Sequence, residues 1–129
     1  MEINELRRKF IIGEEELKEQ LETLVTKTMK YCRLDNGGRV HFENKKLSTK
    51  DKLKVTFAAR AVASQLDPGF SADQTAAELA QTTGIPIDQV RARCAELVAE
   101  HYVESPHRGV FRAIFGKIEG MLDSVTGSD

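Results

Sequence analysis

Hydrophobic residues recur at helical spacing in two consecutive stretches of the second half of the chain. The first stretch has two possible helix starts, because Ser71 with Gln74 and Thr75 with Glu78 both fit the capping box. In that pattern a hydroxyl and a side chain three residues later satisfy unpaired backbone donors. We expect the first helix to begin at one of these pairs and to end at residue 83.

A tight turn separates the two predicted helices. Gly84 can take a left-handed backbone, and Pro86 can begin a helix but cannot continue one. The second helix is predicted from about Pro86 to His101. Its apolar residues have the spacing of one buried face, and they are Ile87, Val90, Cys94, Leu97 and Val98.

A β-hairpin is predicted after the second helix. The segments 102–104 and 110–114 contain β-branched and aromatic residues, and Pro106 and Gly109 supply a turn between them. Helix, short turn, helix and hairpin therefore follow one another in this half of the chain.

Another helix is predicted immediately before this pair. Ser48 stands three residues before Asp51 and can cap its start, whereas residues 67–69, Asp-Pro-Gly, end it. Several alanines keep this helix thin, so that a partner helix can approach closely. Its buried face is expected to contain Leu53, Phe57, Ala61, Val62 and Leu66.

The amino-terminal third contains two further helical patterns and a hairpin. Ile3, Leu6 and Phe10 are spaced for a short helix, although frayed residues over 1–13 are an alternative. In residues 33–44 the Asn-Gly-Gly sequence predicts a hairpin turn, with positive φ at Asn36 and Gly37. We expect the strand residues Val40 and Phe42 to pack on a neighbouring helix.

Two amphipathic segments have surfaces that suit either the core or a second copy of the chain. From Glu14 the core spacing of a coiled coil runs through Leu17, Leu21, Leu24, Thr28 and Tyr31. This helix packs along its own domain or forms a short dimer seam, which would be marginal alone. A closing helix over Phe115, Ile118, Leu122 and Val125, capped by Gly127, covers the core or crosses a subunit boundary. The residues expected at a dimer interface are Leu17, Leu21, Leu24, Ile118 and Leu122.

The string TAAELAQTTGIP, followed by VRARCAELVAEHYVE and RGVFRA, resembles the winged-helix superfamily, and in particular small archaeal and bacterial regulators. The resemblance covers about residues 50–114, and one departure is His101, where many members have glycine. It implies a mainly α protein with small β-hairpins, whose winged helix-turn-helix core spans residues 48–115. An N-terminal helix and hairpin (1–47) and a C-terminal amphipathic helix and tail (116–129) are additions to that core.

Composition limits the possible classes of protein. The 129 residues carry a net charge of −1, so overall charge favours neither nucleic acid nor membrane. Residues 1–67 are nevertheless about +3 and residues 68–129 about −4. No apolar run is long enough for a membrane span and no secretory signal pattern is visible. Cys32 and Cys94 lack metal-site spacing, so we expect reduced, buried thiols and a cytoplasmic protein.

Motifs of enzyme chemistry are missing from the sequence. It contains no GxxxxGK[ST], GxSxG or HExxH pattern. His41, His101 and His107 are not spaced to place two ligands on one face, and Cys94 occupies a core position. We therefore expect no enzyme, no catalytic residue, no metal site and no cofactor.

The sequence predicts a double-stranded DNA-binding transcription regulator, acting as a dimer. The second helix of such a motif enters the major groove, where Gln89, Arg91 and Arg93 suit adenine and guanine edges, while Asp88 and Glu96 would repel phosphate. The remaining expected DNA contacts are His107 and Arg108 in the wing and Lys45, Lys46, Lys50 and Lys52 in a basic segment, which is otherwise a solvated loop. The alternative is an adaptor without DNA binding, which uses its acidic winged half to dock a protein.

Overall fold

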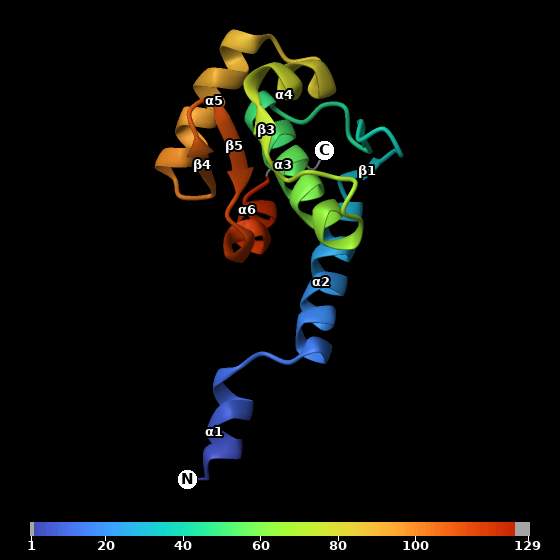
Figure 1. The fold of residues 1–129 in the computed structure, drawn as a ribbon. Helices are drawn as coiled ribbons and strands as arrows, with labels where there is room; N and C mark the ends of the chain where they lie inside the picture. Colours follow the sequence, from blue (N-terminus) through green and yellow to red (C-terminus); the bar gives the residue numbers. More distant parts are fainter. Residues whose placement is uncertain (1, 126–129) are drawn as a thin grey trace.

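The computed structural model describes residues 2–125, which are mainly helical with small antiparallel β-hairpins (Figure 1). This confirms the predicted mixture of secondary structure. In chain order the elements are α1 (Ile3–Phe10), α2 (Glu14–Met29), β1 (Cys32–Leu34), β2 (Val40–Phe42), α3 (Thr49–Leu66), β3 (Gln74–Thr75), α4 (Ala76–Thr83), α5 (Ile87–Ala99), β4 (Val103–His107), β5 (Val110–Ala113), the 3-10 helix η1 (Phe115–Lys117) and α6 (Ile118–Asp123).

Helix α3 is the centre of the fold. It contacts α2, α4, α5, α6 and both strands of the first hairpin, and it runs through the middle of the body in Figure 1. Leu53 and Phe57 are fully buried, and the alanines that follow Phe57 let neighbouring helices approach from several sides. The helix is therefore buried around most of its circumference, and not on one face as the spacing predicted. Leu66 was assigned to the buried face, but as the last residue of α3 it is 61% exposed.

Local capping chemistry sets the helix starts. The N–H of Asp51 donates to Ser48 Oγ at 3.1 Å, as predicted for α3. At α4 the structure contains the complete capping box of Thr75 and Glu78. The alternative start at Ser71 is wrong, because Gln74 belongs to strand β3 instead of a first helical turn.

The turn after α4 and the sheet beside it follow from a few special residues. Gly84 has φ 76° and ends α4, and Pro86 is the N-cap of α5, as the sequence predicted. His101 has φ 66°, so the bend into β4 uses a left-handed backbone at a non-glycine residue. Strands β4 and β5 form the predicted hairpin, and the unpredicted β3 pairs with β5, giving the antiparallel order β3-β5-β4.

The first hairpin has a different turn from the predicted one. Within it Gly38 has the positive φ, of 85°, which was expected at Asn36 and Gly37. Asp35 Oδ1 accepts hydrogen bonds from the N–H groups of Gly37 and Arg39 at 2.9 and 3.0 Å, so the side chain of Asp35 organises the loop. The hydrogen bond with His41, followed by those backbone donors, lowers the pKa of Asp35.

The hairpin packs on α3, as expected for its strand residues. Val40 is buried in a second small core with Val55 and Ala59 of α3. Phe42 is partly buried against the same cluster. This packing fixes the hairpin turn beside the middle of the chain's central helix.

Helices α2 and α6 pack together against α3. Lys27 of α2 makes ion pairs with Glu119 and Asp123 at 2.9 and 3.2 Å, which join the exposed edges of the two helices. Leu24, Ile118 and Leu122 were expected at a dimer interface, but they are at most 6% exposed in the core of the single chain. Of the five predicted interface residues, Leu21 is half-buried and Leu17 is exposed.

The closing segment is shorter than the predicted helix. It begins with η1 and continues as α6, so Phe115 is 41% exposed instead of facing the core. The predicted cap at Gly127 lies outside the described residues.

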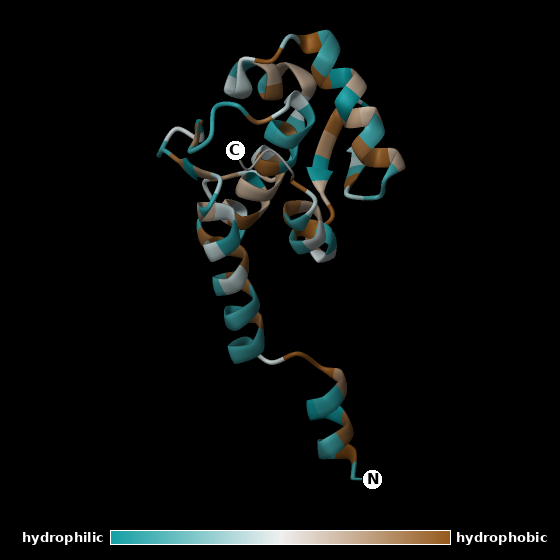
Figure 2. Cartoon of the chain, turned by 180° about the vertical axis from the view of Figure 1, so that it is seen from behind, coloured by the Kyte–Doolittle hydropathy of each residue, from teal (hydrophilic) through white to brown (hydrophobic). Residues whose placement is uncertain are grey.

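The chain begins with an arm, residues 3–17, that projects from the body (Figure 1). Its helix α1 has no buried residue. Figure 2 shows a hydrophobic strip along one side of α1 that continues into the linker to α2. Among the described residues, six of the nine exposed large hydrophobic side chains lie in this arm, namely Ile3, Leu6, Phe10, Ile11, Ile12 and Leu17.

Candidate nucleic-acid interface

Helix α5 has one side in the core and one side in solvent. Val90, Cys94 and Leu97 are fully buried, which confirms the predicted apolar face. The opposite side exposes Asp88 and Arg91 together with short alanine side chains. In Figure 1 this helix lies at the outer edge of the body, so its exposed side is open to a large partner.

Acidic residues neutralise part of the cationic surface of α5. Arg93 Nε lies 2.7 Å from Glu96 Oε2, within one turn of the helix. Lys50, at the start of α3, makes ion pairs with Glu96 and Glu100, and these carboxylates raise the pKa of Lys50, Glu100 more than Glu96. Arg93 and Lys50 are therefore engaged within the chain, although both were predicted to contact DNA.

The start of α3 lies beside α5. The Thr49 hydroxyl donates to Gln89 Oε1 at 3.4 Å, next to the ion pairs of Lys50. The structure thereby connects the predicted base-reading helix with the end of the basic segment 45–54. The sequence did not identify Thr49 and Glu100 as residues of this surface, because no local sequence signal indicates that residues 40 to 50 positions apart are in contact.

The loop of the second hairpin carries His107 and Arg108. Gly109 has φ 78°, and the Ser105 hydroxyl lies 2.6 and 2.8 Å from the carbonyl oxygens of His107 and Val110. These contacts hold the loop closed while both predicted DNA-contacting side chains are exposed.

Several cations of the predicted interface have no carboxylate partner among residues 2–125. Lys52 lies over the ring of Phe42, 6.0 Å from its centroid, and is not ion-paired there. An unpaired cation can bind a phosphate at little cost in free energy, whereas a paired cation must first break its ion pair with a carboxylate. The unpaired set is Lys45, Lys46, Lys52, Arg91 and Arg108.

Metal-ligand groups, free thiols and apolar helices are the remaining features of the described residues that bear on function. The described residues contain no group of three or more His, Cys, Asp or Glu side chains placed to hold a metal ion. Cys32 and Cys94 are buried free thiols, and desolvation raises the pKa of each to about 12. Over residues 2–125, no helix combines the length and apolar character needed to cross a membrane.

Comparison with protein-family models, with curated proteins and with solved structures finds no match to this chain. A function must therefore be argued from the geometry of its own residues.

Proposed function

We propose that α3 to β5 form a winged helix-turn-helix domain that binds double-stranded DNA as a transcription regulator. The order of elements supports this proposal: a helix, a short strand, two helices around the Gly84 turn, and a hairpin. The sheet order β3-β5-β4 supports it too, because its edge strand β4 packs on α5. In this arrangement the second helix of the pair enters the major groove and the loop reaches the adjacent backbone.

The observation that carries the proposal is the contact between the start of α3 and the side of α5. Through Thr49 and Lys50 it brings a basic segment next to the helix that would lie in the groove. Phosphate contacts supply most of the affinity of such proteins, and the base-reading helix needs them at its flanks. Arg91 is the side chain on α5 best placed to reach a guanine edge, since it is exposed and has no carboxylate partner among the described residues.

Salt dependence of binding to a random duplex tests the proposal. The five unpaired cations predict a slope of log K against log salt of about −4.5, which is about a 500-fold loss between about 50 and about 200 mM salt. Fluorescence anisotropy of a labelled duplex measures this slope directly. Failure to bind the duplex at low salt would remove DNA as the partner.

Arg91→Ala should weaken binding and reduce the magnitude of the slope by about 0.9, because one phosphate or base contact is lost. Lys117→Ala is the control, since it removes one positive charge from an exposed residue of η1, outside both α5 and the arm. Equal effects of the two substitutions would mean that only overall charge attracts DNA.

A second candidate is docking of a protein partner on α5. The observation in its favour is that Glu96 and Glu100 neutralise Lys50 and that Glu96 also pairs with Arg93. The double substitution Glu96→Gln with Glu100→Gln separates the two candidates, because it removes the carboxylate partners of both Arg93 and Lys50. Tighter duplex binding with a steeper salt slope supports DNA, whereas an unchanged slope supports the protein partner.

We also propose that the arm, residues 3–17, pairs with the arm of a second copy. Its exposed apolar strip would be covered, and the basic last turn of α1 would meet the acidic first turn of α2 of the partner. Light scattering should give twice the chain mass, and Phe10→Ser should reduce it. The monomer mass at high micromolar concentration would exclude the pairing.

In the cytoplasm, where this proposal places the protein, Cys32 and Cys94 remain thiols.

A further inference from the structure

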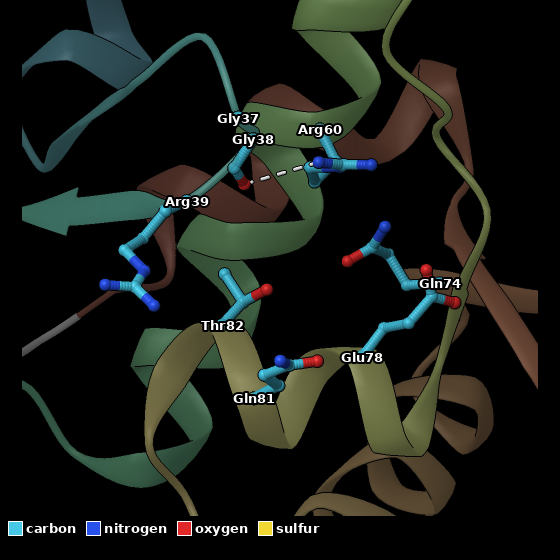
Figure 3. A pocket seen from close by; sticks show the side chains of 8 residues that line it. All are labelled: Gly37, Gly38, Arg39, Arg60, Gln74, Glu78, Gln81 and Thr82. Atoms are coloured by element: carbon cyan, nitrogen blue, oxygen red, sulfur yellow. Dashed lines mark hydrogen bonds between the residues drawn. The ribbon is translucent and has the colours of Figure 1, made fainter.

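A polar pocket of about 300 Å³ lies on the side of α4 that faces the first hairpin. Three parts of the chain form it: the β1–β2 turn, the middle of α3, and the segment from β3 into α4. No apolar side chain among the described residues lines it, whereas most small-molecule sites are lined mainly by apolar side chains. Its lining residues are Gly37, Gly38, Arg39, Arg60, Gln74, Glu78, Gln81 and Thr82 (Figure 3).

Arg60 is held in position on the wall of this pocket. Its Nε donates to the Ser71 carbonyl at 3.1 Å and its Nη1 to the Gly38 carbonyl at 3.3 Å. Its guanidinium also lies over the ring of Phe70, 5.8 Å from the centroid. These neutral partners orient the side chain but leave its charge unbalanced, because no carboxylate pairs with it in residues 2–125. A fixed, uncompensated guanidinium is a strong site for an oxyanion.

Gln74 adds a buried amide with unused bonding capacity. It is only 2% exposed, and its Nε2 donates to the Asp73 carbonyl at 3.1 Å. Its side-chain oxygen accepts no hydrogen bond from the described residues. Figure 3 shows this amide and the Arg60 guanidinium facing the same space, above α4. A ligand hydroxyl can donate to this oxygen, which faces the pocket and is not a buried, unpartnered atom.

Helix α4 supplies the opposite wall. Figure 3 shows the Thr82 hydroxyl and the Gln81 amide rising from α4 toward that space, whereas Arg39 lies at its edge. Thr82 makes no side-chain hydrogen bond within the described residues, and Arg39 has no carboxylate partner among them. The one acid, Glu78, is committed to the capping box through its bond from the Thr75 N–H at 2.9 Å. Donors and positive charge therefore predominate over acceptors in this pocket.

From this geometry we infer that the pocket binds a small hydroxylated oxyanion. Its phosphate or carboxylate group lies against Arg60 and Arg39, and a neighbouring hydroxyl donates to the Gln74 oxygen. Because the ligand would contact the first hairpin, α3 and α4 together, its binding stabilises the folded chain. The inference is independent of the proposed DNA binding, whose surface lies on α5.

Nitrogen-15 NMR at constant ionic strength tests the inference, with inorganic phosphate, acetate, glycerol 1-phosphate and glycerol as separate probes. Phosphate or acetate should shift the Arg60 side-chain N–H and the Gly38 and Thr82 amides first. The probe that binds more tightly, phosphate or acetate, identifies the anionic group of the ligand as a phosphate or a carboxylate. Glycerol 1-phosphate should bind several-fold more tightly than inorganic phosphate, and glycerol alone should cause no shift.

Three variants test whether phosphate binds specifically in this pocket. Arg39→Gln should weaken phosphate binding about tenfold and the isosteric Thr82→Val about threefold, because each removes one donor while leaving the core intact. Lys117→Gln removes an exposed cation from η1, outside both the pocket and the proposed DNA surface, and should leave phosphate binding unchanged. Shifts that spread over Lys45 to Lys52, with equal affinities in all variants, would overturn the site, as would saturating phosphate without any shift at Arg60.

Discussion

Replacing Gly38 with alanine should destabilise the protein more than any other glycine substitution in its turns. Two independent costs combine at this position. The first is the left-handed backbone, φ 85°, which costs an alanine about 1 kcal/mol. The second is a collision, because an added Cβ would stand 2.3 Å from Nη1 of Arg60.

Arg60 can escape the collision only by leaving its position. It would then lose its hydrogen bond to the Gly38 carbonyl and part of its contact with Phe70. These contacts are partly exposed, so their loss is worth about 1 kcal/mol. The sum for Gly38→Ala is therefore about 2 kcal/mol, or a fall in Tm of roughly 6–10 °C for a chain of this size.

Two other glycines provide matched controls. Gly109 has φ 78° with open space where a Cβ would stand, so Gly109→Ala should cost only the backbone strain of about 1 kcal/mol. Gly37 has no positive φ, and its Cβ would meet only Asp35 Oδ1 at 3.4 Å. Gly37→Ala should therefore be close to neutral, or slightly stabilising through the unfolded chain.

Urea unfolding, monitored by circular dichroism, gives the free energy of unfolding of each of the three glycine variants. In an Arg60→Ala background the cost of Gly38→Ala should fall to that of Gly109→Ala, because only strain remains. Equal costs for Gly38→Ala and Gly109→Ala in the unmodified background would refute the reasoning, since Arg60 would then not occupy the space beside Gly38.

Three further predictions concern the bend, the buried ion pair and the thiols. His101→Gly should raise the free energy of unfolding by about 1 kcal/mol, because the exposed side chain at φ 66° is strained; a loss of stability in thermal unfolding would contradict this. Asp51→Ala should cost about 3 kcal/mol and Lys54→Met less, because the two side chains are 6% and 8% exposed and 3.5 Å apart. Each change leaves the other charge buried without its partner, but the carboxylate of Asp51 lies in the first turn of α3, where the helix dipole stabilises it; urea unfolding that ranks the two variants in reverse would exclude this explanation. Cys32 and Cys94 should resist iodoacetamide at pH 8 in the folded protein and react in urea, as read by mass spectrometry. Since their folded pKa of about 12 lies above the ordinary value of 9.0, stability should fall as the pH rises from 9 toward 12, where only the unfolded thiols ionise.

Local side-chain chemistry determined the helix boundaries from the sequence. Ser48 caps α3, Thr75 with Glu78 caps α4, and Gly84 ends α4. Each of these signals acts through backbone groups at most four residues away. The amino-acid sequence of a short segment therefore contains both partners of each capping interaction. The same is true of the buried face of α5, whose period needs only the spacing of its apolar residues.

Tertiary structure alone decided which surfaces remain available. Leu24, Ile118 and Leu122 have the pattern of an interface, but the packing of α2 and α6 on α3 buries them in one chain. Arg93 and Lys50 were expected to contact DNA, and Glu96 engages both. Amphipathic spacing shows that a face will be covered without showing by what, because the covering residues come from distant parts of the chain.

The pocket beside α4 depends on long-range placement in the same way. Arg60 lies in a predicted helix and Gln74 was a candidate capping residue, and no spacing rule connects either of them with Gly38. They meet because the first hairpin packs on α3 and because β3 pairs with β5. The sequence by itself therefore determined the order of helices and hairpins, the cap of α3 and the end of α4, since these depend on bonds within a few residues. The fold decided which charges are paired and where a polar cavity opens, because both depend on distances between atoms far apart along the chain.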